Sequence, residues 1–174
     1  MTGSQYLSAE DSALLRRALV RYAGGACLEI GAGNGGNLAG LSKRFELVVG
    51  TDLDRPSMLD WKEGGGSYVL ADGATCFRPS AFDVVAFNPP YLAEDVKDRT
   101  TQGGEMLEVP KSFLREALRV VRKGGKVVFL LNQEADIREF EEICSRAGYG
   151  LAPVMSKKLF YEELSVYEAS PLSI

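Results

Sequence analysis

The chain has 174 residues, of which 45% are hydrophobic and 25% are charged, a composition typical of one globular domain over residues 1–174. It has no apolar run long enough to cross a membrane, and its first residues lack the basic and apolar regions of a secretory signal, so we expect neither. The net charge of −4 argues against a protein whose main task is to neutralise phosphates, and the absence of histidine excludes Ser-His and Cys-His triads.

Cysteine usage indicates the cellular compartment. Cys27, Cys76 and Cys144 are too few and too scattered for a disulfide framework or a zinc site. They are typical of buried thiols in a reducing environment, so we expect a cytoplasmic protein. We also expect no metal site, because histidine, the commonest metal ligand, is missing.

Helices are predicted from apolar repeats and their boundary residues. A Ser8–Asp11 capping box precedes a helical repeat, which predicts a helix over residues 9–23 that Gly24-Gly25 ends. Pro110 predicts the first turn of another helix, which Gly124-Gly125 ends. Further helices are expected at Leu38–Leu41, at residues 134–147 before Gly148 and, as a short piece, at Pro56–Trp61.

Apolar runs that end at glycine, aspartate or asparagine predict the strands. They cover residues 26–30, 46–51, 67–71, 82–87, 126–131, 151–156 and 160–169, the last two as a hairpin. Strands that alternate with helices predict an α/β fold with a parallel sheet covered on both faces, and the hairpin adds an antiparallel edge. The polar stretch Leu92–Val109 is longer than an ordinary connection, so we expect it to be functional or mobile.

Polar residues and glycines gather where four predicted strands end. The first strand runs into Glu29-Ile-Gly31-Ala-Gly33-Asn-Gly-Gly, and the next three end at Asp52, Asp72 and Asn88. In open α/β sheets, ligands bind outside the carboxyl ends of the strands. The glycines allow close approach to a ligand, and a carboxylate at position 52 can accept both hydroxyls of a ribose. This placement predicts a nucleoside-cofactor site.

The segment Asn88-Pro89-Pro90-Tyr91 separates two kinds of cofactor chemistry. The glycine pattern also fits a dinucleotide fold. Two prolines make a stiff corner without N–H donors, however, so the carbonyls of Asn88 and Pro89 stay free to accept hydrogen bonds. With the Asn88 amide oxygen and the Tyr91 ring they form an acceptor cage for a planar NH₂ group. Hydride transfer needs no such cage, whereas methyl transfer to an amide or amino nitrogen does.

These motifs resemble the class I S-adenosylmethionine (SAM) methyltransferases of the Asn-Pro-Pro-Tyr group. Within it, the chain resembles the short eukaryotic and archaeal branch of the HemK-type protein-glutamine N5-methyltransferases. Tyr6–Ser12, Cys27–Glu29 and Glu163–Val166 add to this likeness, with Ser8 and Ser12 in place of the branch's proline and threonine. The resemblance implies a seven-stranded, Rossmann-like sheet, mostly parallel with an antiparallel terminal hairpin.

The resemblance also implies roles for individual residues. Glu29, Gly31 and Gly33 would hold the amino-acid and ribose region of SAM, and Asp52 the ribose hydroxyls. Asp72 and Gly73 would hold the adenine, and Ser12 would close over the cofactor. Asn88, Pro89, Pro90 and Tyr91 would form the catalytic corner, which grips the N–H groups of a carboxamide and turns its lone pair towards the methyl group.

The methyl acceptor is left among three classes. The resemblance favours the glutamine of the Gly-Gly-Gln loop of a translation release factor, and an amino group of adenine or guanine in nucleic acid is the alternative. A lysine side chain in a protein is a further alternative methyl acceptor. Between Leu92 and Val109 there are five acids and two bases, which would repel a phosphate backbone and suit a basic protein, although a solvated loop explains them equally well. A SAM-binding subunit without catalysis is disfavoured by the intact Asn88–Tyr91 motif.

A partner subunit is also expected. The branch that the chain resembles works with a small zinc-binding activator protein. In this fold the third strand is a sheet edge, and Ser67–Ala71 carries no charge, so the edge can pair with another chain. The alternative is that the chain's own segment around Trp61 covers this edge.

Overall fold

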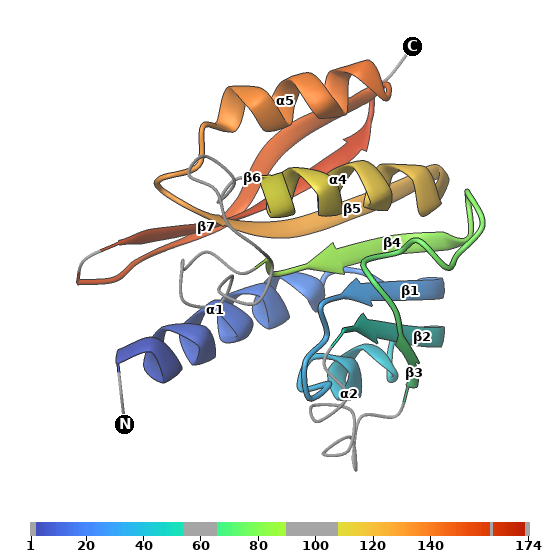
Figure 1. Ribbon diagram of the computed structural model, residues 1–174, viewed down its shortest axis with the longest axis horizontal. Coiled ribbons are helices and arrows are strands. Elements are labelled where there is room, and N and C mark those ends of the chain that lie inside the picture. Colours follow the sequence, from blue (N-terminus) through green and yellow to red (C-terminus); the bar gives the residue numbers. More distant parts are fainter. Residues whose placement is uncertain (1–2, 54–65, 90–107, 161, 173–174) are drawn as a thin grey trace.

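The computed structural model describes residues 3–53, 66–89, 108–160 and 162–172 (Figure 1). The predicted short helix at Pro56–Trp61 and most of the Leu92–Val109 stretch lie outside the described residues. The elements are, in chain order, α1 (Gly3–Leu19), β1 (Gly24–Ile30), α2 (Leu38–Leu41), β2 (Phe45–Asp52), β3 (Ser67–Leu70), β4 (Phe82–Phe87), α4 (Glu108–Val120), β5 (Val121–Asn132), α5 (Ile137–Arg146), β6 (Tyr149–Lys158) and β7 (Glu163–Pro171).

The described strands form one seven-stranded sheet in the order β3-β2-β1-β4-β5-β7-β6. Strands β1 to β5 pair in parallel, whereas β7 pairs antiparallel with both β5 and β6. The predicted α/β fold with a terminal antiparallel hairpin is therefore confirmed, and β3 is an edge strand as expected.

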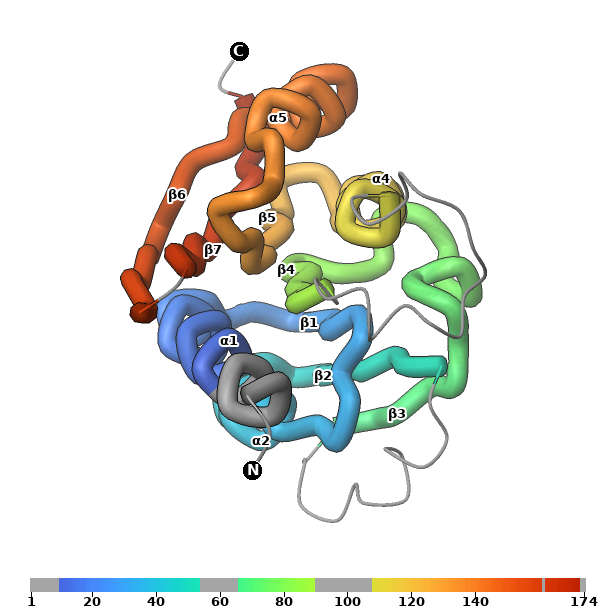
Figure 2. The backbone as a smooth tube through the Cα atoms, turned by 60° about the vertical axis from the view of Figure 1, so that its left-hand side comes forward, coloured from blue at the N-terminus to red at the C-terminus, as the bar shows by residue number. Residues whose placement is uncertain are grey.

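Helices cover both faces of the sheet (Figure 2). On one face, α1 and α2 bury a mainly aliphatic cluster against the sheet that includes Leu15 and Leu38. On the other, α4 and α5 bury a second cluster, in which Phe87 and Phe129 stack with their ring centroids 4.9 Å apart. The parallel strands between the two helical layers were predictable from the sequence, because a parallel strand buried on both faces is apolar throughout.

The strand register brings the carboxyl ends of the central strands to one edge of the sheet. Ile30 at the end of β1 pairs with Thr51 of β2 and with Phe87 of β4. The tip of the β6–β7 hairpin lies on the same side, because Leu164 pairs with Asn132 at the end of β5. The residues that follow these strands therefore face one common region.

The boundaries of three helices differ from the sequence prediction. Helix α5 covers Ile137–Arg146 instead of residues 134–147, because Asp136 caps it. Helix α1 begins at Gly3 and continues through Ser8, because a cap preference of about 1 kcal/mol does not stop a helix that gains a hydrogen bond with each further residue. It ends at Leu19, since Gly24 already belongs to β1. Helix α4 begins at Glu108, so Pro110 is its third residue, still within the first turn where proline is tolerated.

Gly124 and Gly125 do not end α4, as the sequence predicted, but lie inside β5. The strand begins as soon as α4 ends, because Val121 pairs with Phe82, and the register then shifts before Val84. Gly124 has a φ of +85°, and a Cβ at Gly125 would lie 2.5 Å from the carbonyl oxygen of Asp83. The two glycines thus form an irregularity that lets β5 continue along β4.

The cysteines are free thiols, but the expectation that all are buried is wrong for one of them. Cys27 and Cys144 are buried, whereas Cys76 is exposed because it lies in the turn region between β3 and β4. Among the described residues, no helix is both long and apolar enough to span a membrane.

Candidate active site

The glycine-rich segment after β1 forms a tight turn against the end of β2. Gly31 and Gly33 have φ values of +70° and +52°, which glycine adopts without steric cost. The N–H of Gly33 donates to Oδ2 of Asp52 at 2.8 Å, and the N–H of Ala32 donates to the carbonyl of Thr51 at 2.9 Å. A Cβ added at Gly33 would meet no described atom within 4 Å, so space is open beside the turn. The structure thus brings three predicted residues together.

Glu29, at the end of β1, is buried and bound on one side. Its Oε1 accepts a hydrogen bond of 2.6 Å from Nδ2 of Asn37, whose Oδ1 accepts from Nε of Arg16 at 3.1 Å. Burial raises the pKa of the Glu29 carboxyl to about 7, although the hydrogen bond from Asn37 and the charge of Arg16 oppose the shift. This carboxyl therefore changes its protonation near neutral pH.

Three buried oxygens near the carboxyl ends of the strands have no hydrogen-bond partner within the described part of the chain. They are Oε2 of Glu29, Oγ1 of Thr51 and Oδ1 of Asn88, on β1, on β2 and directly after β4. Buried polar atoms are almost always paired in folded proteins. Their concentration at this edge indicates a region built to receive hydrogen-bond donors.

The predicted acceptor corner is only partly described. Asn88 is half-buried and Pro89 is buried, directly after β4. Pro90 and Tyr91, also predicted to be catalytic, lie outside the described residues. The described residues therefore include only the first half of the predicted corner.

Asp72 and Gly73 lie in the connection that follows β3. Asp72 is exposed, and its carbonyl accepts bonds from the N–H and the hydroxyl of Thr75, at 3.2 and 2.7 Å. Gly73 is buried with a φ of +56°, and Glu116 of α4 occupies the space where a Cβ would project. The turn therefore requires glycine at this position.

Ser12 is half-buried on α1, between two contacts that place this part of the helix at the same edge of the sheet. Lys157 of β6 pairs with Glu10, and Arg16 contacts Asn37. The neighbouring Asp11 has a buried Oδ1 with no partner among described residues, and its pKa is raised to about 6, chiefly by burial.

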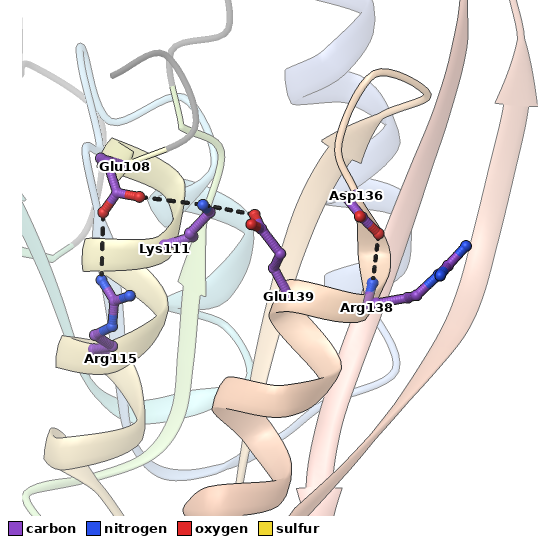
Figure 3. A network of polar contacts seen from close by, with 6 residues as sticks. All are labelled: Glu108, Lys111, Arg115, Asp136, Arg138 and Glu139. Carbon is purple, nitrogen blue, oxygen red and sulfur yellow. Dashed lines mark hydrogen bonds and ion pairs between the residues drawn. The ribbon is translucent and has the colours of Figure 1, made fainter. Parts of the chain in front are cut away.

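Charged residues tie the beginnings of α4 and α5 together (Figure 3). The ammonium of Lys111 lies 2.6 Å from Glu139 of α5 and 3.1 Å from Glu108, and its side chain is only 11% exposed. The hydrogen bond to Glu139 is the main reason that the pKa of Lys111 is raised. Asp136 caps α5 by accepting from the N–H of Arg138. This network fixes the start of α4.

Comparisons with known proteins agree with this geometry. The chain matches the family described as a methyltransferase domain over residues 28–129. It is also 30% identical, over 94% of its length and 90% of the relative's, to a protein of Methanocaldococcus jannaschii whose name proposes it as a protein N5-glutamine methyltransferase. The chain belongs to the HemK-type class I methyltransferases.

Solved structures show the same fold for this HemK-type methyltransferase. A chain of the E. cuniculi Mtq2–Trm112 complex, described as responsible for methylation of the termination factor eRF1, is 27% identical with a TM-score of 0.78, over 94% of this chain and 96% of that one. The SAM-bound magnesium protoporphyrin IX methyltransferase of Synechocystis is 16% identical with a TM-score of 0.66, over 98% and 80%. At that identity the second likeness concerns the fold alone.

Sequence reasoning missed two residues that contact the candidate site. Asn37 directly precedes α2, where an asparagine suggests a helix cap, yet its side chain makes no cap bond and binds Glu29 instead. Glu116 lies on the helical repeat of α4 and reaches a turn 42 residues earlier in the chain, a contact that no local pattern indicates.

Proposed function

We propose that this methyltransferase transfers a methyl group from SAM to the side-chain amide nitrogen of glutamine in the Gly-Gly-Gln loop of a translation release factor. The observation that carries the proposal is the buried Oδ1 of Asn88 at the carboxyl end of β4, which has no hydrogen-bond partner in the part of the chain that the structure describes, in a chain of the HemK type. An oxygen there can accept a hydrogen bond from the NH₂ group of the glutamine that receives the methyl group.

The described residues fit SAM as the cofactor. The open space at Gly33 leaves room for a ligand beside Asp52. Oε2 of Glu29, which has no partner among the described residues, suits the cationic amino-acid end. Asp72 and Gly73 would hold the adenine, and Ser12 would cover the cofactor. When bound, SAM supplies a methyl group on a positively charged sulfur, which is open to attack by a nitrogen lone pair.

The protein's own contribution is orientation. The lone pair of an amide nitrogen is delocalised into its carbonyl, so the nitrogen is a weak nucleophile. Acceptors at Asn88 and Pro89 would hold both N–H groups and turn the lone pair towards the methyl group. Fixing reactants in such a geometry supplies roughly 7–11 kcal/mol in favourable cases. A dedicated general base is not required, because the proton leaves after transfer.

We further propose that a small partner subunit, a zinc-binding activator, pairs with the β3 edge. Leu70 at the end of β3 is 51% exposed, and Leu47 and Leu53, on and directly after the neighbouring strand β2, are each 49% exposed. An apolar strand at the edge of a sheet is a template for strand addition. The Mtq2 relative is found in complex with Trm112, which supports a partner of this kind.

The test is transfer of a radiolabelled methyl group from SAM, by the chain co-expressed with a Trm112-type partner. The substrates are a release factor, its Gly-Gly-Ala variant, and bulk tRNA, rRNA and DNA. We expect label on the release factor and none on the Gly-Gly-Ala variant. Label that appears only on nucleic acid would overturn the glutamine assignment in favour of the nucleobase alternative, and label retained by the variant would indicate another residue, such as lysine.

A further inference from the structure

Two side chains of α4 make hydrogen bonds to the backbone of the connection from β3 to β4. A carboxylate oxygen of Glu116 accepts a hydrogen bond from the N–H of Ala74. Arg119, one turn further along the helix, donates from Nη2 to the carbonyl of Ala74 at 2.8 Å and from Nη1 to the carbonyl of Phe77 at 2.7 Å. Both backbone groups of Ala74, a fully buried residue, are thus bound to charged side chains.

These hydrogen bonds lie directly beside Asp72 and Gly73, the predicted adenine-binding residues. Gly73 has a φ of +56°, and an added Cβ would overlap the carboxylate of Glu116. On the other side of the turn, Thr75 bonds to the carbonyl of Asp72 through its N–H and its hydroxyl. Hydrogen bonds therefore fix the backbone of residues 72–75 at Asp72 and at Ala74. The bonds at Ala74 come from side chains of α4.

We infer that Glu116 and Arg119 are positioning residues for adenine recognition, an inference that rests on the proposed function through the assignment of Asp72 and Gly73 to the adenine. Hydrogen bonds to ionised groups are about twice as strong as neutral ones, so these contacts hold the turn firmly. Without Glu116 the N–H of Ala74 is buried and unpaired, and the turn has to rearrange to satisfy it. When the backbone of the turn rearranges, the direction of the Asp72 carboxylate changes as well.

The position of Glu116 on its helix makes this contact specific to the turn rather than to the fold of α4. Glu116 is half-buried and flanks the apolar face formed by Leu114, Ala117 and Val120, without being one of its buried residues. Its removal leaves that apolar face intact. We therefore expect the effect to appear in ligand recognition more than in global stability.

The experiment measures binding of S-adenosylhomocysteine and of its inosine counterpart, in which the adenine amino group is replaced by a carbonyl, by calorimetry. The variants are Glu116→Ala, Glu116→Gln and, as a matched control, Glu142→Ala on the exposed side of α5. For Glu116→Ala we expect adenosine-ligand affinity to fall about tenfold, with a much smaller change for the inosine ligand. Glu116→Gln should recover most of the preference, because its amide oxygen accepts the same N–H.

Each outcome separates the inference from the proposed function. An adenine-to-inosine preference that Glu116→Ala leaves within twofold of wild type overturns the inference, and so does an equal loss for both ligands. Asp72→Asn tests the site itself: if adenosine-ligand affinity is unchanged in that variant, the adenine assignment is wrong, whatever Glu116 does. Should Glu116→Ala fail to fold, Arg119→Gln carries the same test from the carbonyl side of Ala74.

Discussion

Asn37 donates a hydrogen bond of 2.6 Å to Oε1 of Glu29, and the two side chains are only 7% and 3% exposed. The hydrogen bond offsets part of the free-energy cost of burying the Glu29 carboxylate, but Oε2 of Glu29 has no partner among the residues described. Burial therefore dominates and raises the pKa of Glu29 to about 7. The protein keeps a partly satisfied carboxyl group at the point where we expect the cationic end of the cofactor.

Glu29→Gln should stabilise the ligand-free protein at alkaline pH. The pKa of this carboxyl is about 7 in the folded protein, against 4.5 for an unperturbed glutamate. The stability that its protonated form contributes is fully present below about pH 4.5 and is lost as pH rises through 7. Without ligand, the variant should be more stable than wild type by about 3 kcal/mol at pH 8. Urea unfolding at pH 8 and at pH 5 checks this, and an equal difference at both values would contradict it.

The same substitution should weaken cofactor binding in a pH-dependent way. Above pH 7 the ionised Glu29 can pair with an ammonium group, and below it the neutral acid cannot. We expect wild-type affinity for S-adenosylhomocysteine to fall between pH 8 and pH 6, and the Glu29→Gln profile to be flatter. Calorimetry at both pH values measures it, with Glu142→Gln as control. Parallel profiles for wild type and Glu29→Gln would argue against a cofactor role for Glu29.

Asn88→Ala should remove methyl transfer while leaving the fold intact. Its Oδ1 makes no hydrogen bond to a described residue, so its loss leaves no described donor unpaired. Loss of one preorganised polar contact to a reacting group costs roughly 10²–10³-fold in kcat. We expect a decrease of at least 100-fold in single-turnover transfer with a thermal midpoint near that of wild type. Activity within a few-fold of wild type would refute a catalytic role for this side chain.

Leu70→Lys should prevent assembly with the partner subunit. Leu70 is 51% exposed on the β3 edge, and a lysine there places a charge in the path of an added strand. The control is Val20→Lys, which changes a side chain that is 54% exposed at the end of α1. Co-purification with a Trm112-type protein should be lost for Leu70→Lys alone. Assembly by both variants, or by neither, would contradict docking at β3.

Phe129→Ala should be among the most destabilising single changes. Its ring is fully buried on β5, stacked on Phe87, with Phe140 and Tyr167 at centroid distances of 6.0 and 6.1 Å. Truncation of a buried phenylalanine costs about 3–5 kcal/mol. Phe160→Ala, which changes a side chain that is 91% exposed, should stay within about 0.5 kcal/mol of wild type. Denaturant unfolding compares the two, and similar losses would show that the core is misassigned.

Lys111→Met should loosen the start of α4. The substitution keeps the length of the side chain but leaves the carboxylates of Glu108 and Glu139 without their shared cation. Since both carboxylates are about half exposed, we expect a loss of only about 1 kcal/mol. A double-mutant cycle with Glu139→Gln measures the coupling, and zero coupling would mean that the ion pair contributes nothing.

The existence of the strands, the terminal hairpin and the edge position of β3 were predictable, whereas the helix boundaries were not. Buried parallel strands are continuous apolar runs, and glycine, aspartate or asparagine marks their ends. The end of α4 depends instead on tertiary pairing, because Val121 leaves the helix to pair with Phe82. Gly124, read locally as a helix terminator, adopts its positive φ within the strand instead.

At the site, sequence reasoning found the residues that follow strands and missed those that support them. Gly33 and Asp52 meet as expected, since parallel register fixes where strands end. Asn37 and Glu116 act across the chain through side-chain geometry, which neither periodicity nor spacing encodes.

The two layers of the fold differ in their aromatic content, and this has a practical consequence. Six of the eight phenylalanines belong to the α4–α5 face: Phe77, Phe82, Phe87, Phe113, Phe129 and Phe140. The other face holds Phe45, and Phe160 lies near the hairpin tip. Fluorine-labelled phenylalanine would therefore report almost exclusively on one layer, so that nuclear magnetic resonance could follow motions beneath the turn at residues 72–75 without interference from α1.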